Sequence, residues 1–401
     1  MANNSVVCRQ CGQAQNDPVF RLEAMPLAGA FQKPSDPVSS DNYFPISLHA
    51  CGRCGLVQLE ESISPDVLFR NYSFSTNTIS SLVTHFSEYA DWLITNRNPS
   101  TVFEFGCNDG TLLKFLRTKG VKVMGADAAN NIVDFARAEG LDVINEYFTV
   151  DLADEILKKI GPIDVVTGSN CFAHNPDPIA ILDAARSVLS DDGVFIVEVM
   201  YAGDLLKKLQ WDTLYHEHLT VFSLQSISWL FRSQGWSVVD VVHLPMHAGS
   251  IRVVASPKLD QKPSAAVDAL LAAEKSMRLN AHQTWVDFGA RARRQISLVA
   301  DVTNALAQKN RLWAYGASGR ATMWMNACNM DYIERVVDSS PLRAERVVPK
   351  VNIPIVFPDE MRKTPPDYML ITAWNYAAGI CAKEYWYQGR WITPLPELKI
   401  W

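Results

Sequence analysis

Short apolar runs alternate with stretches of helical periodicity between Thr101 and Ser256. This alternation constrains the fold more than any other feature, because strands connected through helices form βαβ units and a mostly parallel sheet. The predicted strands lie at 102–105, 121–126, 165–168, 194–199, 236–243 and 251–255. Apolar residues at helical spacing over 66–97 predict a helix that leads into this α/β segment.

A glycine-rich loop joins the first predicted strand to a predicted helix at 111–117. Its residues Glu104, Gly106 and Gly110 have the E-x-G-x-x-x-G spacing typical of S-adenosylmethionine-dependent methyltransferases. The glycines permit a tight turn and a close approach of the backbone to a ligand. The spacing differs from the G-x-G-x-x-G of dinucleotide enzymes. We therefore expect the loop, including Asn108, to bind a nucleoside cofactor. The alternative is a glycine turn that binds no ligand.

Three further residues complete the predicted cofactor site. Asp127 ends the second strand, where a carboxylate can accept hydrogen bonds from two ribose hydroxyls. Asn170 lies at the end of the fourth strand region. Phe148 either faces the adenine ring or packs in the core, and the sequence leaves both possibilities open.

Length and charge exclude several classes of protein. A chain of 401 residues is too long for one ordinary core and suggests two or three domains. A formal net charge of -6 argues against nucleic-acid partners and membrane surfaces, and no apolar run approaches the ~20 residues needed to cross a bilayer. The first residues lack the basic and apolar regions of a signal peptide. We expect a cytoplasmic protein that is a monomer or a weak homo-oligomer.

Two cysteine pairs, Cys8-x-x-Cys11 and Cys51-x-x-Cys54, lie in the first 70 residues. A glycine follows each pair and lets the backbone turn so that its amides can face the thiolates. Four sulfurs satisfy tetrahedral Zn²⁺ and leave no position for water, which indicates a structural site. A rubredoxin-like iron site and four free thiols are the alternatives. We expect a zinc module over 1–70 that is needed for folding and not for chemistry.

The second half of the chain repeats the order of strand, glycine turn and helix. An Ala-, Arg- and Leu-rich segment at 259–310 predicts one or two connecting helices. Strands are predicted at 312–315, 333–337, 353–356 and 368–372. Gly316, Ser318 and Arg320 occupy the turn before a helix, where free backbone N–H groups bind anions. We therefore expect domains at 71–258 and 311–401, joined by the connector 259–310.

The run Tyr215-His216-Glu217-His218 places two imidazoles, a carboxylate and a phenol in four residues. Such a cluster can remove a proton from carbon or bind a metal. The cofactor loop upstream favours proton abstraction coupled to group transfer. A hydrolytic zinc site would need a third, distant ligand that the sequence does not identify.

Together these motifs resemble the zinc-containing sugar C-methyltransferases, which methylate C-3 of nucleotide-linked 4-keto-deoxysugars. The resemblance spans essentially the whole chain and includes Met246-His-Ala-Gly-Ser-Ile-Arg252, Tyr315-Gly-Ala-Ser-Gly319 and Val337-Asp338. It implies an α/β protein with a small N-terminal zinc module, a central Rossmann-like methyltransferase domain and a C-terminal Rossmann-like α/β domain that helps to bind the nucleotide sugar. It also implies S-adenosylmethionine and a structural Zn²⁺ as cofactors.

The resemblance implies a role for each residue of the cluster. His218 is the expected general base, because a 4-ketone makes the neighbouring C-3 proton acidic enough for a positioned imidazole to remove. Glu217 orients His218 or holds a sugar hydroxyl. Tyr215 and His174 hydrogen-bond the keto or hydroxyl oxygens, and Tyr72 reaches the site from the segment after the zinc module.

Other residues are expected near the phosphates of the nucleotide sugar. Arg252 can pair bidentately with a phosphate, and a solvated or salt-bridged arginine is the equal alternative. The turn with Gly316 and Ser318 is expected to hold the pyrophosphate, with Arg320 adding charge. His216 is expected to face away from the substrate.

The chain departs from the family pattern where the acceptor is expected to bind. It has Ala-Ser-Gly-Arg-Ala-Thr at 317–322 in place of Ala-Pro-x-Lys-Gly-Asn, and it lacks the usual Lys-Gln-Gly-Arg…Pro-Gly-Thr-His pattern around 343–352. Val221 stands where an aromatic residue is commoner. These changes leave open which nucleoside and sugar bind. Two alternatives are kept: a methyltransferase of another polar metabolite, and a non-catalytic nucleotide-sugar binding protein.

Overall fold

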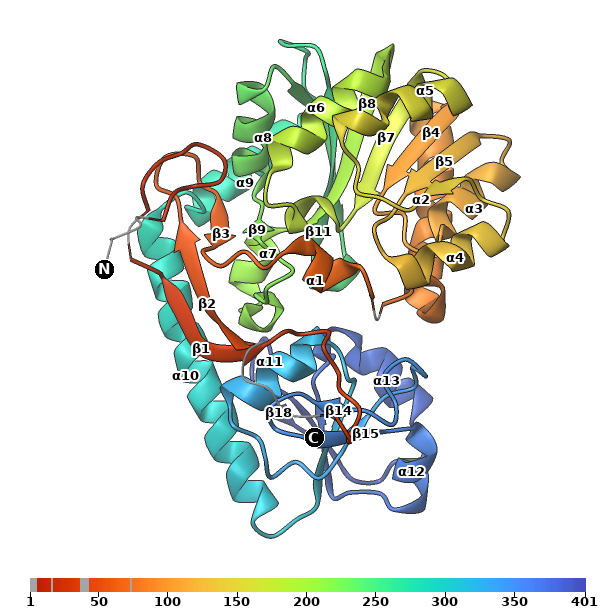
Figure 1. Ribbon diagram of the computed structural model, residues 1–401. Coiled ribbons are helices and arrows are strands. Elements are labelled where there is room, and N and C mark those ends of the chain that lie inside the picture. Colours follow the sequence, from red (N-terminus) through yellow and green to blue (C-terminus); the bar gives the residue numbers. More distant parts are fainter. Residues whose placement is uncertain (1–5, 16, 37–42, 73) are drawn as a thin grey trace.

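The computed structural model describes residues 6–15, 17–36, 43–72 and 74–401. Figure 1 shows two α/β lobes stacked one above the other, with the N-terminal segment and one long helix running along a side of both. The first five residues, which bear on the predicted absence of a signal peptide, lie outside the described part.

The central lobe is built on a seven-stranded sheet of order β10-β11-β8-β7-β4-β5-β6. Pairs from β8 to β6 are parallel, whereas β10–β11 and β11–β8 are antiparallel. The predicted mostly parallel α/β sheet is therefore confirmed. The strands are β4 (Thr101–Phe105), β5 (Lys122–Ala126), β6 (Val143–Ile144), β7 (Ile163–Ser169), β8 (Leu189–Met200), β10 (Ser237–Leu244) and β11 (Ser250–Ser256).

Helices cover both faces of this sheet, because successive residues of each strand point to opposite sides and most of them on both sides are apolar and buried. Val102 and Val165 pack with α2 and α3 on one face, and Phe103 and Phe195 pack with α5, α6 and α8 on the other. The helices of the lobe are α2 (Ser80–Arg97), α3 (Thr111–Thr118), α4 (Asn130–Ala138), α5 (Ala153–Ile160), α6 (Pro178–Val188), α7 (Ala202–Lys207) and α8 (Leu224–Ser233).

The N-terminal module forms a small antiparallel sheet of order β1-β2-β3-β9, from β1 (Phe20–Pro26), β2 (Tyr43–Ala50), β3 (Val57–Leu59) and β9 (Thr220–Val221). Its buried residues Ile46, Leu48 and Val57 belong to a large cluster that also contains residues of the C-terminal lobe. Strand β9 begins two residues after His218, so the small sheet of the module contains residues that follow the candidate catalytic run in the chain.

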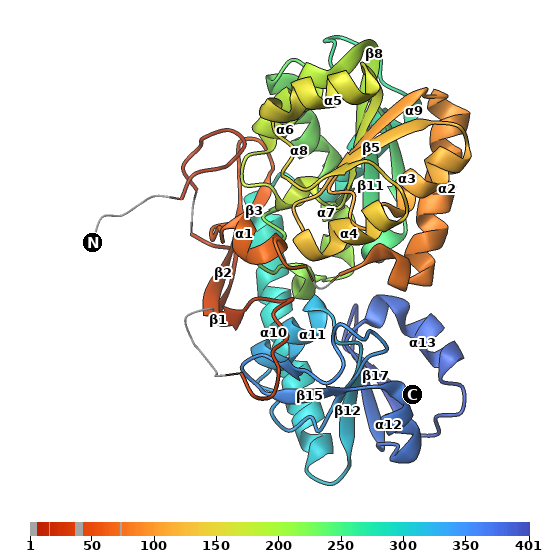
Figure 2. The ribbon, with the colours of Figure 1, turned by 45° about the vertical axis from the view of Figure 1, so that its right-hand side comes forward.

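Two helices connect the lobes, α9 (Ala265–Met277) and α10 (His282–Ala307). Helix α10 lies along both lobes in Figures 1 and 2. It packs closely on the N-terminal sheet at Gly289, where a Cβ would lie 2.0 Å from the carbonyl oxygen of Val19. No helix in the described ranges is long and apolar enough to cross a membrane.

The C-terminal lobe repeats the α/β pattern in a sheet of order β14-β15-β13-β12-β16-β17-β18. Its first strand, β12, lies between parallel neighbours β13 and β16, as β4 lies between β5 and β7. The elements are β12 (Leu312–Tyr315), β13 (Val336–Val337), β14 (Val347–Val348), β15 (Ile353–Val356), β16 (Tyr368–Ile371), β17 (Arg390–Thr393), β18 (Lys399–Ile400), α11 (Gly319–Ala327), α12 (Pro358–Lys363) and α13 (Ala377–Lys383). The domain boundaries at 70, 258 and 310 stay predictions.

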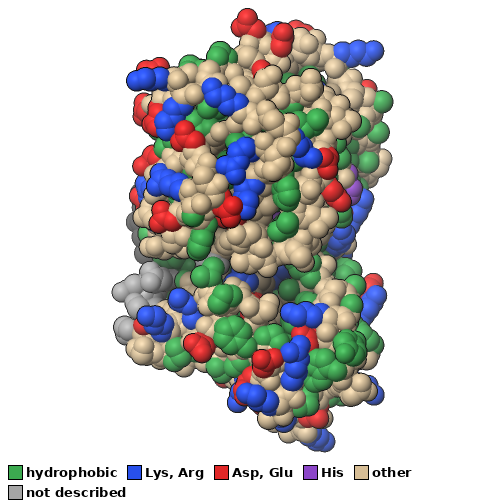
Figure 3. Space-filling view, turned by 90° about the vertical axis from the view of Figure 1, so that its right-hand side faces the viewer, with side chains coloured by type: hydrophobic (Ala, Val, Ile, Leu, Met, Phe, Trp, Pro, Cys, Tyr) green, Lys and Arg blue, Asp and Glu red, His purple; other side chains and the backbone are tan. Residues whose placement is uncertain are grey.

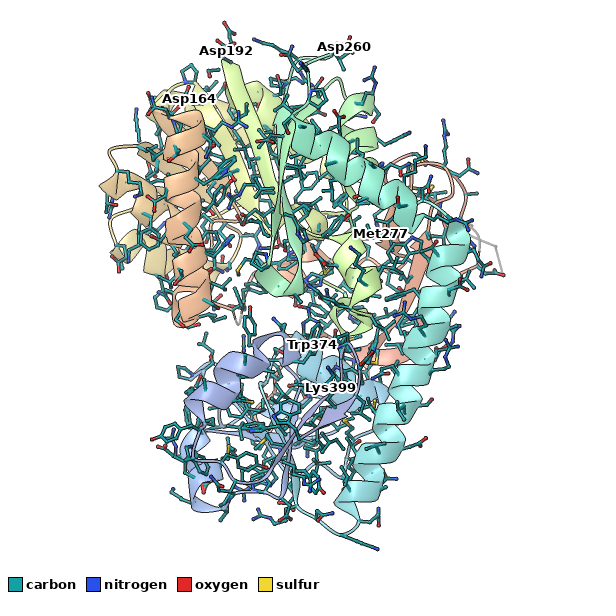
Figure 4. All side chains as sticks on the ribbon, turned by 180° about the vertical axis from the view of Figure 1, so that it is seen from behind. Asp164, Asp192, Asp260, Met277, Trp374 and Lys399 are labelled. Carbon is teal, nitrogen blue, oxygen red and sulfur yellow. The ribbon has the colours of Figure 1, made fainter. Side chains whose placement is uncertain are left out.

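Asp212, in the 3₁₀ helix η5 (Trp211–Thr213), joins the two lobes. Its buried carboxylate accepts hydrogen bonds from the Arg320 Nη1 (2.6 Å), the Trp324 Nε1 (3.0 Å) and the Trp374 Nε1 (2.8 Å). All three donors belong to the C-terminal lobe, and Figure 4 shows Trp374 where the lobes meet. Burial raises the pKa of Asp212 against the opposing pull of Arg320. This contact fixes the candidate catalytic run relative to the C-terminal lobe.

We expect Asp212→Asn to lower the free energy of unfolding by about 3–5 kcal/mol, because it leaves the buried guanidinium of Arg320 without a counter-charge. Urea titration measures the change. Asp192→Asn is the matched control, since it removes an exposed ion pair with Lys258 at the far end of the central lobe (Figure 4) and should leave stability unchanged. Equal stability of Asp212→Asn and the wild type would contradict the expectation.

Candidate active site

One cavity of about 1170 Å³ opens between the lobes, and residues of both line it. Figure 3 shows the surface hollowed at the waist between them. The carboxyl ends of β4, β5 and β7 meet it from the central lobe, and the end of β12 meets it from the other. Open α/β sheets bind ligands at this edge. The volume exceeds the ~300–1,000 Å³ usual for one small ligand and has room for two.

The glycine loop after β4 forms the central-lobe wall of the cavity. Gly106 lines the wall with φ +63°, and a Cβ there would lie 2.7 Å from the Cβ of Cys171. Gly110 differs from the expectation. It is not among the residues that line the cavity, and a Cβ on it would lie 2.3 Å from Leu141 Cδ1. Gly110 therefore shapes the turn through packing and does not face a ligand.

Two buried carboxylates beside the loop fit a nucleoside cofactor with a cationic part. Glu104 Oε2 is buried and has no hydrogen-bond partner among the described residues, and burial raises the pKa of this carboxyl well above its usual range. Asp127 accepts the backbone N–H groups of Asn108 and Ala129, each at 2.8 Å. These bonds hold both carboxylate oxygens at the cavity wall, with lone pairs left for the hydroxyls of a ribose.

Asn108 hydrogen-bonds the segment 74–76, which also lines the cavity. Its backbone has φ +52°, and its Oδ1 accepts from the Thr76 backbone N–H at 3.0 Å while its Nδ2 donates to the Phe74 carbonyl at 3.1 Å. Asn170, also left-handed with φ +58°, lines the cavity. Phe148 lines it too and stacks on Phe105 at a centroid distance of 5.7 Å, so it is both a cavity wall and a core residue.

We expect Asp127→Asn to weaken binding of S-adenosylhomocysteine about 10- to 100-fold. An amide loses the charge that strengthens hydrogen bonds to hydroxyls, a difference of about 1.5–3 kcal/mol. Calorimetric titration measures the affinity. Asp134→Asn, on the exposed face of α4, is the control and should bind like the wild type. Unchanged affinity in Asp127→Asn would contradict the assignment of Asp127 to the ribose.

His218 is oriented by its own chain and exposed to the cavity. Its Nδ1 donates to the Thr213 carbonyl at 2.6 Å, which leaves the Nε2 lone pair as the basic position. Burial, only partly opposed by that bond, lowers the pKa of His218 to about 4. The imidazole is therefore neutral near pH 7, the form that a base requires.

Aromatic rings surround this imidazole. Tyr215 lies beside it with ring centroids 4.2 Å apart, and His174 lies on it at 5.2 Å. Phe69 of α1 (Pro65–Phe69) stacks on the other side of His174 at 5.5 Å. The structure thus brings together three of the predicted catalytic side chains. His216, by contrast, is buried with its Nε2 against the carbonyls of Phe44 and Pro45.

One of the two roles predicted for Glu217 was to orient His218, and the structure does not support it. The Glu217 Oε2 accepts the Tyr72 hydroxyl at 3.0 Å, and the partner of His218 is a backbone carbonyl. The reason is geometric: the turn at 215–218 sends neighbouring side chains in different directions. Burial raises the pKa of Glu217 to about 7, against the hydrogen bond from Tyr72. Glu217 and Tyr72 therefore form a pair whose charge changes near neutral pH.

We expect the rate of the reaction to fall as the pH drops below about 7, because protonated Glu217 no longer accepts the Tyr72 hydroxyl as a carboxylate. In Glu217→Gln the fall in rate near pH 7 should disappear, and the rate should stay constant with decreasing pH until His218 is protonated near pH 4. The pH dependence of kcat/KM in both proteins checks this. A limb at pH 7 that persists in Glu217→Gln would assign it to another group.

The C-terminal lobe contributes the opposite wall. Gly316 has φ +98° and lines the cavity, as does Ser318, whose buried Oγ has no partner among the described residues. Arg320 also lines it but is engaged within the protein. Its Nη1 donates to Asp212, and its Nη2 donates to Gln210 and to the His247 carbonyl. The prediction that Arg320 offers a free guanidinium to a phosphate is thus corrected.

Arg252 is not a phosphate ligand. Its guanidinium is buried, donates to Glu198 Oε1 at 2.9 and 2.6 Å, and lies 3.6 Å from the ring centroid of Tyr89. Antiparallel pairing of β11 with β8 sets Arg252 opposite Glu198. The alternative of a salt bridge within the protein is therefore the one that the structure supports.

Thr213 and Arg343 are among the cavity residues that were missed as site residues. Thr213 supplies the carbonyl that orients His218. Arg343 lines the cavity 3.6 Å from Asp338, and its charge opposes the rise in the pKa of Glu217. Spacing in the sequence cannot identify either, because one acts through its backbone and the other comes from a different lobe.

The four predicted zinc ligands converge in the N-terminal module. Their sulfur atoms lie within 4.8 Å of one another, with Cys8–Cys54 at 3.5 Å and Cys11–Cys51 at 3.6 Å. Tetrahedral zinc with Zn–S bonds of about 2.3 Å requires sulfurs about 3.8 Å apart. The cysteines therefore fit a closed Zn²⁺ site, and none of the four lines the cavity.

Family models match three successive parts of the chain. A zinc binding domain matches residues 8–69, a methyltransferase domain matches 74–241, and a C-methyltransferase C-terminal domain matches 245–396.

The chain is 34% identical over 403 residues to the C-methyltransferase NovU of Streptomyces niveus. The alignment covers 98% of this chain and 96% of that protein. The chain is 29% identical over 101 residues to the ubiquinone biosynthesis O-methyltransferase of Xylella fastidiosa (strain 9a5c), covering 25% of this chain and 41% of that one. Among solved structures, magnesium protoporphyrin IX methyltransferase from Synechocystis PCC 6803 with bound SAM is 16% identical, with 43% of this chain and 78% of that chain covered at a TM-score of 0.33.

Proposed function

The chain belongs to the C-methyltransferase family, and from this premise we propose that it methylates C-3 of a nucleotide-linked 4-keto-deoxysugar. The protein is a methyltransferase that uses S-adenosylmethionine and carries a zinc site. The sugar acceptor is the part that is proposed. The observation that carries it is a neutral imidazole, His218, fixed through Nδ1 to Thr213 and facing a cavity with room for two ligands.

A base of this kind is needed for methylation of carbon and not for methylation of a nucleophilic oxygen of low pKa. His218 Nε2 takes the proton from the carbon next to the ketone, and the electron pair of that C–H bond moves toward the ketone oxygen. A positioned base contributes ~10²–10⁴ in rate. S-adenosylmethionine, when bound by Glu104 and Asp127, supplies a methyl group on a sulfonium.

The residues around His218 would hold the sugar. Tyr215 and His174 both lie beside the base and carry hydrogen-bonding groups for the keto or hydroxyl oxygens. Tyr72 and Glu217 form a second polar pair near them. Burial lowers the pKa of His174 well below its usual range, so that it binds as a neutral donor or acceptor.

The nucleotide would bind in the C-terminal lobe. The Asp338 Oδ2 accepts the Ala317 backbone N–H at 2.7 Å, which parallels the bond of Asp127 with Asn108 in the central lobe. Asp338 lines the cavity and follows β13, as Asp127 follows β5. This parallel supports a second ribose at Asp338. Gly316 and Ser318 would hold the pyrophosphate, with charge from Arg343 in place of Arg320.

The test is deuterium wash-in with a panel of nucleotide 4-keto-6-deoxysugars in D₂O, with and without S-adenosylmethionine, followed by mass spectrometry. The expected result is exchange at one carbon without the cofactor and the gain of one methyl group with it. Binding of the cofactor with neither exchange nor methyl gain across the panel would overturn the keto-sugar acceptor and favour another polar metabolite.

A further inference from the structure

A second imidazole, His247, reaches the cavity from a strained turn between β10 and β11. Three successive residues, His247, Ala248 and Gly249, have φ of +51°, +71° and +134°. L side chains rarely adopt this region, and such residues persist only where the surroundings hold them, most often at functional sites.

Side chains of both lobes hydrogen-bond the backbone carbonyls of this turn. The Arg320 Nη2 donates to the His247 carbonyl at 3.3 Å, and the Ala248 carbonyl accepts from Lys208 Nζ at 2.6 Å and from Gln210 Nε2 at 3.0 Å. A Cβ on Gly249 would lie 2.2 Å from Asp204 Oδ2, so only glycine fits there. Both lobes thus fix the path of the chain at His247.

The imidazole of His247 lines the cavity. It makes no hydrogen bond with any residue in the described ranges, although it lies beside several charged groups. Burial lowers the pKa of His247 to about 4, with a smaller contribution from the positive charge of Arg320, and the charges of His85 and Glu198 also contribute to this pKa. His247 in turn contributes to the lowered pKa values of His174 and His218. His247 is therefore a neutral imidazole that lines the same cavity as the cofactor loop and His218.

We propose that His247 donates an N–H hydrogen bond to the ketone oxygen of the acceptor while His218 removes the adjacent proton. The proton moves from carbon to His218 Nε2, the C–H electron pair becomes the C=C bond of the enolate, and the carbonyl π pair moves to oxygen. A neutral donor stabilises that oxygen without protonating it, so the carbon keeps its nucleophilic character. This role rests on the proposed keto-sugar function.

The left-handed backbone decides which variants are informative. Glycine adopts this conformation at no steric cost, so His247→Gly removes the imidazole and preserves the turn. Asparagine also tolerates it, so His247→Asn is a second deletion of the ring. Ala248→Gly is the matched control, because it loosens the same turn, keeps the imidazole and alters no side chain that lines the cavity.

Each variant is compared with the wild type in deuterium wash-in, in methyl transfer and in affinity for S-adenosylhomocysteine. Loss of one preorganised donor reduces such rates by about 10²–10³. We expect His247→Gly to slow wash-in and kcat together by that amount, and His247→Asn, which keeps an amide N–H donor, to slow them less. KM, cofactor affinity and melting temperature should stay close to those of Ala248→Gly.

Four outcomes would overturn the role of His247. Wash-in at the wild-type rate in His247→Gly is one. A loss confined to cofactor affinity is another, since it would assign His247 to the cofactor. An equal loss of rate in Ala248→Gly would assign the effect to the turn. Absence of exchange in the wild type itself would overturn the keto-sugar function and this role with it, and is recognised without any variant.

Discussion

His218→Asn lowers the rates of deuterium wash-in and methyl transfer about 10³-fold, because a carbon acid needs a positioned base and such a base contributes ~10²–10⁴. Asparagine is the informative replacement. Its side-chain N–H can still donate to the Thr213 carbonyl, which the His218 Nδ1 now contacts at 2.6 Å, and only the basic Nε2 is lost. The affinity for S-adenosylhomocysteine should change little, since Glu104 and Asp127 remain.

The comparison with two other histidines gives this prediction its specificity. His282→Asn, at the start of α10 and outside the cavity lining, should retain the wild-type rate. His247→Gly should retain the base and lose only the proposed donor, so its wash-in should fall less than that of His218→Asn. Full activity in His218→Asn would overturn the assignment of the base and favour a nucleophilic acceptor, such as an oxygen, that needs no carbon deprotonation.

Cys51→Ser should remove the Zn²⁺ and unfold the N-terminal module. Apparent binding free energies for structural zinc sites are about 10–16 kcal/mol, as large as the whole stability of a typical domain at about 5–15 kcal/mol. The effect should reach the active site, because β3 of the module pairs with β9 at Val57–Val221, three residues after His218. Methyl transfer should therefore be lost even though no cysteine of the cluster lines the cavity.

Metal analysis and thermal unfolding check this expectation. The wild type should hold about one Zn²⁺ per chain and Cys51→Ser close to none. Cys381→Ser is the control, since Cys381 lies on α13 outside the cluster and should leave zinc content and stability as they are. Full zinc content in Cys51→Ser would rule out the four-cysteine site, and iron in the purified protein would favour the rubredoxin-like alternative.

Features that depend on neighbours in the chain were predicted well. The Cys-x-x-Cys pairs, the E-x-G-x-x-x-G loop and the central strands follow from local stereochemistry and from the two-residue and 3.6-residue periods of strands and helices. The predicted strand at 102–105 and helix at 111–117 match β4 and α3 to within a residue. The N-terminal sheet was missed, because its strands become buried against residues far away in the chain, in α10 and in both lobes.

The partners of the polar side chains were predicted less well. Arg320 was expected near a phosphate, and Arg252 was given a phosphate or a salt bridge as equal possibilities; both have carboxylate partners, Asp212 and Glu198. These partners lie 108 and 54 residues away in the chain, and nothing in the local pattern selects them. Glu217, next to His218 in the sequence, pairs with Tyr72.

The sequence by itself determined the parts: a four-cysteine module, a cofactor loop on a parallel sheet, and a Tyr-His-Glu-His run with the chemistry of a base. Only the tertiary structure decided how they work together. It gives His218 its orienting carbonyl, joins the lobes at Asp212 and brings His247 to the cavity. The physical reason is that propensity and periodicity act over a few residues, whereas burial and hydrogen-bond pairing depend on which distant elements pack together.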